Sequence, residues 1–488
     1  MPATAGSRRC GSVSEVPGAV PVPGTGQALA AAVARLRADG VGVVLTGAET
    51  TLPYARDRSG HDPGDVVFAV VVARSVADVQ QVCRVSAEFG VPVIPRGAGT
   101  GYAGGAAATE GAIILSLGKL TAITGIDPDS GLCVVEPGVI TSEISAAARA
   151  VGLRYAPDPA SAAISTIGGN IATNAGGLCC VKYGVTRDSV LALDVVLAGG
   201  ELIHTGHRSI KGVSGYDLTA LFVGSEGTLG VVVGATLRLL PVPLGSVHTI
   251  AAFFETAEQA TAASVDLFAT GVRPSMLELI DGVHLSRIDD WRGSDFRARG
   301  AGLLLVQTDG LAAAAEAALL RDVLVRSGGE IEVTDDARRT DELLDIRRWT
   351  SQDQAPRPEI TLNEDFAVPR HRLVEMVRLI EATSARFGVV ITILAHIGDG
   401  NLHANLRIPR SELGPDGALP ERAWLAADAM IAGALEFGGT ITGEHGIGML
   451  KRRWLRTELG DVQYGLQRSL KTLFDPQHLL NPGKVFLD

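Results

Sequence analysis

The segment HIGDGNLH, from His396 to His403, combines metal-binding side chains with a turn signal. Its Asp399-Gly400 pair is the strongest kind of two-residue hairpin turn signal, and the two glycines argue against a continuous helix. A turn at that pair places His396 directly opposite His403, with their Cβ atoms about 5 Å apart. Two imidazoles on one face at that spacing can bind a single metal ion.

A second loop, GGTITGEHGIG at 438–448, places Glu444 and His445 between glycines. Two histidines and one carboxylate form a usual open site for zinc, manganese or iron, with positions left for a substrate. A single histidine is more often a core residue whose nitrogens satisfy hydrogen bonds. Four such residues in two glycine-framed loops favour a site instead. We therefore predict a divalent metal, zinc or manganese, at these loops.

Three glycine-rich segments in the first half of the chain predict a long anionic ligand. PRGAGTGYAGGA at 95–106 follows an apolar strand, and its five glycines let consecutive amides converge on an anion such as a pyrophosphate. It is not a P-loop, and taken alone it is equally compatible with simple turns. The small residues of 160–177 and 211–232 permit close approach to a flat ligand. Together the three segments favour a dinucleotide.

The elements that carry these segments change in character along the chain. Strand and helix patterns alternate up to Pro241 and Pro243, which mark a domain boundary. A helix that begins after Ser75, as its N-cap, belongs to this first part. Beyond the prolines, longer Ala/Leu-rich helices such as 257–270 alternate with single strands. The first part is α/β in character, the second is an α+β domain, and α+β is the fold class expected for the chain.

Composition narrows the class of protein. The chain has 488 residues and a formal net charge of −11, so nucleic-acid binding is not expected, because phosphate contacts need a basic surface. No apolar run reaches the roughly 20 residues that cross a bilayer, so a cytoplasmic protein is expected, with peripheral contact at the inner membrane face left open. The cysteines lack a framework or CxxC spacing, which predicts reduced thiols. They are Cys10, Cys83, Cys133, Cys179 and Cys180.

Long motifs give the chain a family resemblance. The loop at 95–105, DPASAAISTIGGNIATNAGG at 158–177, YGVTRD at 183–188, GYDLTALFVGSEGTLG at 215–230 and LLNPGKVF at 479–486 resemble the vanillyl-alcohol-oxidase-like flavoproteins. The branch it resembles contains D-lactate dehydrogenases, D-2-hydroxyglutarate dehydrogenases and glycolate oxidase D-subunits. The resemblance covers about residues 50 to 486.

The resemblance implies a two-lobed PCMH-type FAD-binding domain beneath an α+β cap domain with an antiparallel sheet and helices. The expected boundaries are a disordered lead-in at 1–25, the FAD domain at 26–242, the cap or substrate domain at 243–465, and a C-terminal segment at 466–488 that returns to the FAD domain.

The resemblance also implies which residues bind FAD. By position they are Arg96, Gly97, Ala98, Gly99, Thr100, Gly101, Ser161, Thr166, Gly169, Asn170, Thr173, Gly176, Gly224, Glu226, Gly227 and Asn481, together with the segment near Asp188. Relatives with covalently bound flavin often carry a histidine where this chain has Thr100. Noncovalent FAD is therefore expected.

For the reaction, the resemblance implies His396, His403 and Glu444 as metal ligands, and it makes His445 the catalytic base. Further matches concern the substrate. Asn405 matches a substrate contact, and Arg347 resembles an arginine that clamps the substrate carboxylate. Arg348 is the alternative if the register differs by one, and a surface ion pair is the alternative role for Arg347. Asn363 stands where 2-hydroxyglutarate members tend to carry a lysine for a second carboxylate.

These expectations describe an FAD-linked dehydrogenase that oxidises a D-2-hydroxy acid, D-lactate or a similar monocarboxylate ahead of D-2-hydroxyglutarate. Its electron acceptor is a quinone, a cytochrome, an electron-transfer flavoprotein or an iron–sulfur subunit, and a homodimer is one possible assembly. One alternative is a glycolate-oxidase-D-type flavin subunit that works only with an iron–sulfur partner. Another is a flavin-free, metal-dependent hydrolase or isomerase.

Overall fold

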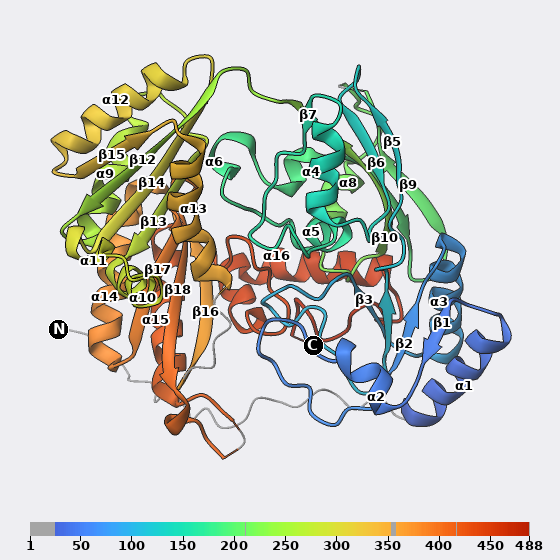
Figure 1. Ribbon diagram of the computed structural model, residues 1–488. Helices are drawn as coiled ribbons and strands as arrows, with labels where there is room; N and C mark the ends of the chain where they lie inside the picture. Colours follow the sequence, from blue (N-terminus) through green and yellow to red (C-terminus); the bar gives the residue numbers. More distant parts are fainter. Residues whose placement is uncertain (1–24, 210, 353–357, 416, 488) are drawn as a thin grey trace, which may run out of the picture.

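The computed structural model describes residues 25–209, 211–352, 358–415 and 417–487. The predicted lead-in at 1–25 lies outside the described residues, except for Thr25, at which the first helix begins. The chain forms two halves that stand side by side, and the long helix α16 runs across the middle of the view from the edge of the second half to below the upper lobe of the first (Figure 1). The blue-to-green half comes from the first part of the sequence, and the yellow-to-orange half from the second.

The first half begins with a small lobe built on a four-stranded sheet in the order β1-β2-β4-β3. Strands β2, β4 and β3 are parallel, and β1 is antiparallel to β2. Helix α3 begins after Ser75, whose hydroxyl accepts the amide of Asp78, so the predicted N-cap is confirmed. Its buried face packs Val79 and Val82 against the sheet. The elements are α1 (Thr25–Ala38), β1 (Val43–Leu45), α2 (Ala48–Thr51), η1 (Leu52–Tyr54), β2 (Ala69–Val72), α3 (Val76–Phe89), β3 (Val93–Arg96) and β4 (Ile113–Ser116).

A second lobe completes this half with a five-stranded antiparallel sheet in the order β5-β6-β10-β8-β9. Short helices cover its inner face, where Ile144, Ile167 and Phe222 are fully buried. The elements are β5 (Ile123–Asp127), β6 (Leu132–Val135), α4 (Thr141–Arg149), β7 (Leu153–Arg154), α5 (Ile167–Thr173), α6 (Cys180–Tyr183), α7 (Thr186–Ser189), β8 (Val190–Val196), β9 (Leu202–Gly206), α8 (Leu218–Phe222), β10 (Val231–Arg238) and β11 (Leu240–Pro241).

The second half is one seven-stranded antiparallel sheet, in the order β15-β12-β14-β13-β17-β18-β16. Helices α9, α12, α14 and α15 bury its outer face in the largest core of the molecule. The elements are β12 (Ser246–Phe254), α9 (Ala257–Phe268), β13 (Met276–Asp281), α10 (Gly282–Arg292), α11 (Phe296–Arg299), β14 (Gly302–Gly310), α12 (Ala313–Arg326), β15 (Glu330–Thr334), α13 (Ala337–Gln352), β16 (Glu359–Ala367), η2 (Arg370–Arg372), α14 (Leu373–Phe387), β17 (Val390–His396), η3 (Ile397–Asp399), β18 (Asn401–Pro409), η4 (Arg410–Glu412) and α15 (Glu421–Glu436).

Strand alternation decides what the inner face of this sheet carries. Successive side chains of a strand point to opposite faces. On β18, Leu402, Ala404 and Leu406 pack into the helix-covered core, so His403 and Asn405 lie on the other face. The same alternation brings polar side chains of β13, β16 and β17 to that face, which looks towards the first half of the molecule (Figure 1).

The C-terminal part ties the two halves together. Helix α16 (Arg452–Phe474) has a kink at Gly460, and its buried Lys471 donates to the carbonyl of Thr228 in the first half. The last residues return to the small lobe, where Leu480 bridges to Val93. None of the described helices has both the length and the apolar character that a membrane crossing requires.

Candidate active site

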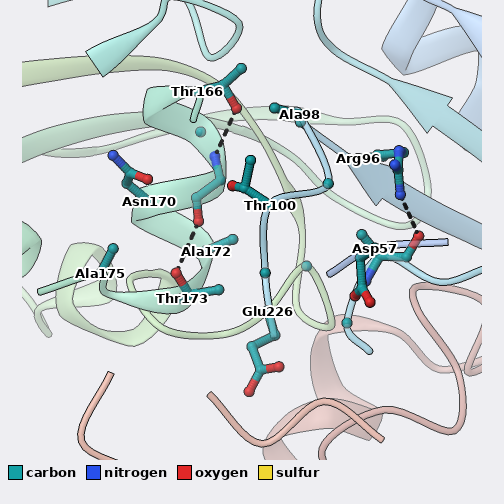
Figure 2. A pocket seen from close by; sticks show the side chains of 18 of the residues that line it. Asp57, Arg96, Ala98, Thr100, Thr166, Asn170, Ala172, Thr173, Ala175 and Glu226 are labelled. Carbon is teal, nitrogen blue, oxygen red and sulfur yellow. Dashed lines mark hydrogen bonds between the residues drawn. The ribbon is translucent and has the colours of Figure 1, made fainter. Parts of the chain in front are cut away.

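The three glycine-rich segments line one cavity of about 530 Å³, within the range of cofactor sites. The loop that follows β3 forms one wall, and helix α5 with the residues before it forms the opposite wall (Figure 2). Glu444 and His445, from the second half of the molecule, also line this cavity. The cavity therefore reaches the histidine cluster.

The walls of the cavity approach closely because they lack Cβ atoms. A Cβ at Gly97 would lie 2.2 Å from the hydroxyl oxygen of Thr166, and one at Gly176 would lie 2.9 Å from a carboxylate oxygen of Glu444. Thr166 also caps α5 by accepting the amide of Gly169 (Figure 2). A side chain at position 97 would displace Thr166, whereas a Cβ at position 176 would require only the end of the Glu444 side chain to move. The narrow cavity between these walls suits an extended cofactor such as FAD.

The structure brings most of the expected FAD residues to this cavity. Those that line it are Arg96, Gly97, Ala98, Gly99, Thr100, Gly101, Ser161, Thr166, Gly169, Asn170, Thr173, Gly176, Glu226 and Gly227. Gly224 and Asn481 do not line it. The amide of Gly224 donates to Ile171, and the Asn481 side chain donates to the carbonyls of Gly105 and Glu226, so both brace the walls from behind. The structure places Asp188 outside this cavity, where its carboxylate accepts the amide of Val185.

The two histidines of HIGDGNLH lie together, although the predicted register was wrong. Strand β17 pairs His396 with Asn401, and His403 faces Leu394. The chain turns through η3 and Gly400 rather than through Asp399-Gly400 alone, which shifts the pairing by two residues. An even shift keeps both side chains on the same face. Their ring centroids are 5.2 Å apart.

Glu444, which is half-buried, completes a three-residue group with these two buried histidines. One of its carboxylate oxygens, Oε1, lies 3.5 Å from His396 Nε2, 3.2 Å from His403 Nε2 and 3.8 Å from His445 Nε2. His396, His403 and Glu444 are therefore arranged as a set of donors that could hold one ion. This donor set has the chemistry of an open zinc or manganese site.

Glu278 orients the His396 ring by contacting the nitrogen that faces away from Glu444. Its carboxylate lies 2.8 Å from His396 Nδ1, which leaves Nε2 directed at Glu444. A carboxylate on the far nitrogen is the usual support for a metal-binding histidine. Burial lowers the pKa of His396, but Glu278 and Glu444 outweigh that effect and raise it to about 10. The same negative potential favours a bound cation.

A second possible metal group, Asp365 with His403 and His445, fits less well. Asp365 Oδ2 accepts the amides of Gly443, Glu444 and His445, and Oδ1 accepts the Thr442 hydroxyl and the ammonium of Lys451. These bonds occupy its oxygens, so we interpret Asp365 as the residue that shapes the 442–445 loop. It presents Glu444 and His445 to the cavity.

His445 has the surroundings of a neutral imidazole. Its ring stacks on His403 at 5.1 Å and lies 5.0 Å from the ring of Tyr102, a residue of the glycine loop that follows β3. Burial lowers its pKa to about 4, with Asp365 opposing that effect. A neutral imidazole can accept a proton near pH 7. Its Nε2 lies on the Glu444 side, where the other two Nε2 atoms converge.

The expected substrate residues lie on the same face of the sheet. Arg347 of α13 is 3% exposed, and its Nε donates to Glu278 at 2.7 Å. Its Nη2 is 3.4 Å from His396 Nε2. Arg348 points outward and pairs with Asp345. The inward arginine is therefore Arg347, and its partner is a buried residue of the site rather than a surface acid.

Asn405 and Asn363 are partners across β16 and β18, directly opposite one another. Both lie on the face that carries His403. The pair stands beside the histidine cluster, at the position where the family resemblance expects substrate contacts.

Sequence reasoning missed Glu278, Asp365 and Lys451. Each is a charged residue whose side chain is almost fully buried. Glu278 lies inside the apolar strand MLELID, and a lone acid within such a run is a signal of a paired buried charge. Their partners are far away in the sequence, so the pattern alone does not reveal them.

Two family models match the two halves of the chain. A model described as "FAD binding domain" matches residues 68–206, and one described as "FAD linked oxidases, C-terminal domain" matches residues 245–485. The chain belongs to this family of FAD-linked oxidoreductases, which confirms the expected cofactor class and sets aside a flavin-free hydrolase.

Individual relatives show to which branch of the family the chain belongs. It is 37% identical to glycolate oxidase subunit GlcD of Bacillus subtilis, over 86% of this chain and 88% of the relative. It is 35% identical to D-lactate dehydrogenase of Archaeoglobus fulgidus, over 86% of this chain and 91% of the relative. The expected branch of the family is therefore confirmed.

The fold has a solved counterpart. The structure of p-cresol methylhydroxylase with substrate bound superposes with a TM-score of 0.75 at 18% identity, covering 95% of this chain and 98% of that one. The predicted PCMH-type fold, a two-lobed FAD-binding half with an α+β cap, is confirmed.

Proposed function

We propose that this protein oxidises a D-2-hydroxy acid to the 2-oxo acid, with D-lactate or a similar monocarboxylate favoured. The observation that carries the proposal is the position of Glu444 and His445. Both line the cavity formed by the glycine-rich loops, and they lie beside His396 and His403. The printed names of the relatives, a D-lactate dehydrogenase and a glycolate oxidase subunit, support this substrate class.

When bound, noncovalent FAD supplies the hydride acceptor, and zinc or manganese at His396, His403 and Glu444 supplies charge that stabilises a developing alkoxide. The residues of the chain bind the substrate and move its proton. His445, neutral because burial lowers its pKa to about 4, takes the hydroxyl proton at Nε2.

The residues that orient the substrate lie at the inner face of the seven-stranded sheet. Arg347 binds the substrate carboxylate, and Asn405 contacts the substrate from β18. Asn363, opposite Asn405, offers no charge for a second carboxylate. This position favours a monocarboxylate over a 2-hydroxy dicarboxylate.

Substitution of Arg347 by Lys is expected to lower kcat/KM by about 10- to 100-fold. Lysine keeps the charge but cannot bind a carboxylate through two parallel N–H groups, and a charged hydrogen bond contributes about 1.5–3 kcal/mol. Steady-state kinetics with D-lactate measures the effect. The matched control is Arg348→Lys, which changes an outward side chain and should leave kcat/KM within about twofold. Equal losses in both variants would contradict the assignment of Arg347.

Substitution of Glu278 by Gln is expected to weaken metal binding by about 10- to 100-fold, because the His396 ring loses the carboxylate that orients it. Titration of the metal-free protein with Zn²⁺ and Mn²⁺ measures the affinity. Glu436→Gln, at the exposed end of α15, is the control with the same change of charge. An unchanged metal affinity in Glu278→Gln would show that the ion does not bind at His396.

The experiment that tests the function is anaerobic mixing of the FAD-loaded protein with D-lactate, L-lactate, glycolate and D-2-hydroxyglutarate. Bleaching of the flavin by D-lactate well before L-lactate and D-2-hydroxyglutarate is expected. No bleaching by any 2-hydroxy acid would overturn the proposal. The proposed electron acceptor is a quinone, a cytochrome, an electron-transfer flavoprotein or an iron–sulfur subunit, and a panel of these distinguishes them.

The similarity to a GlcD subunit supports a second candidate, a flavin subunit that turns over only with a partner. One experimental result would distinguish this second candidate from the first. Glycolate would bleach the flavin, but catalytic turnover would begin only when an iron–sulfur protein is added.

A further inference from the structure

Glu226 links the two halves of the molecule at the cavity. It belongs to the 224–227 loop of the first half and is only 8% exposed. Its carboxylate accepts the amides of Ile447 at 2.7 Å and Gly448 at 2.8 Å, which belong to the loop that carries Glu444 and His445. In Figure 2 the side chain points away from Thr100, which lies on the facing glycine loop.

The backbone of Glu226 is held as firmly as its side chain. Its φ is +52°, a left-handed conformation that costs a residue with a Cβ roughly 1 kcal/mol or more. The amide donates to Ala172 at 2.8 Å, and the carbonyl accepts Asn481 Nδ2 at 2.8 Å. The strained backbone and these two bonds fix the direction in which the carboxylate leaves the loop.

The 443–448 loop is thus held from both sides. Asp365, from the cap sheet, accepts the amides of Gly443, Glu444 and His445. Glu226, from the FAD-binding half, accepts the next two available amides. Gly446 passes between them at φ +83°, and a Cβ there would lie 3.0 Å from the Glu226 carboxyl carbon. His445 therefore sits on a segment whose two ends are fixed by different domains.

We propose that Glu226 is a positioning residue that sets Glu444 and His445 against the FAD cavity, rather than a residue whose main role is to bind the cofactor. The inference rests on the proposed function of His445. Both carboxylate oxygens of Glu226 are already engaged by the loop amides. Its effect on the reaction is therefore transmitted through the loop.

The test is the isosteric variant Glu226→Gln in the FAD-loaded protein. Each loop amide donates to a different carboxylate oxygen, and a carboxamide replaces one of these oxygens by an NH₂ donor, so in the same orientation one of the two loop amides loses its partner. The expected result is unchanged FAD content and a fall of about 10- to 100-fold in the rate of flavin reduction at saturating D-lactate, because small displacements of reacting groups have effects of that size. Glu110→Gln is the matched control, since Glu110 also accepts a backbone amide, from Val67, away from the cavity.

Hydrogen exchange supplies a readout that does not depend on turnover. Exchange of the backbone amides in the peptide spanning 443–449 should accelerate by about tenfold or more in Glu226→Gln and not in Glu110→Gln. Loss of FAD with normal reduction of the remaining holoenzyme would overturn the proposal, and so would unchanged reduction with unchanged exchange. If no 2-hydroxy acid reduces even the wild-type flavin, the proposed function fails, and the exchange result alone decides the role of Glu226.

Discussion

Replacement of His445 by Asn should leave FAD bound and lower the rate of flavin reduction by at least about 100-fold, the lower range for loss of a general base. Asparagine keeps a polar group of similar reach but cannot take up a proton near pH 7. The ring it replaces lies against His403 and Tyr102, so the FAD cavity itself keeps its other walls. Single-turnover mixing with D-lactate measures the rate.

Two further measurements make this result specific. Metal content should stay within about twofold of wild type, because His445 is not one of the three expected ligands. His204→Asn, at an exposed position on β9, should behave as wild type in both measurements. Reduction at the normal rate in His445→Asn would remove this residue from the mechanism, whereas loss of FAD would make it a cofactor residue.

The FAD cavity could be predicted from the sequence because its walls are local. Each glycine-rich segment follows or precedes its own strand or helix, and the segments meet in one cavity of the expected kind. The expected residues that do not line it, Gly224 and Asn481 together with Asp188, could not be separated from the others. Whether a side chain faces a cavity or braces its wall depends on neighbours such as Ile171 and Gly105, which are distant in sequence.

The turn between His396 and His403 shows a different limit of sequence reasoning. The Asp399-Gly400 signal predicted a turn of two residues, but the turn uses four, from Ile397 to Gly400. Ile397 is fully buried, and a Cβ at Gly398 would lie 2.8 Å from the side chain of Val181. The turn is therefore set by packing that the local sequence does not show, of Ile397 in the cap core and of Gly398 against the FAD-binding half. The predicted face was right because the register error was even.

Partners far apart in sequence could not be predicted at all. Glu278 and His396 are 118 residues apart and meet because β13 pairs with β17. Asp365 reaches the Glu444 amide across 79 residues. Arg347 and Arg348 could not be separated either, because each follows a buried leucine by one helical turn, and the contact that turns Arg347 inward is with Glu278, 69 residues away.

Lys451→Met should be the most destabilising of the substitutions considered. The ammonium of Lys451 is 3% exposed and donates to Asp365 Oδ1 at 2.9 Å and to the carbonyl of Ile441 at 2.8 Å. It also lies 3.5 Å from Glu364. Removing it leaves two buried carboxylates without a counter-ion, which typically costs about 3–5 kcal/mol. Denaturant unfolding followed by tryptophan fluorescence measures the loss, and Lys119→Met, at an exposed position, is the control.

The pH dependence of the loss of stability in Lys451→Met separates a charge effect from a packing effect. Burial raises the pKa of Glu364 above its ordinary value of 4.5, with Lys451 opposing and Asp365 adding to the rise. Without Lys451, the penalty should be present in full above that raised pKa and should shrink as the pH falls towards 4.5, because a protonated Glu364 needs no counter-ion. The double variant Lys451→Met, Glu364→Gln should recover part of the stability at pH 7 for the same reason. A loss that is independent of pH and unchanged by Glu364→Gln would show that Lys451 acts through Asp365, its packing and its carbonyl bonds, and not through the charge of Glu364.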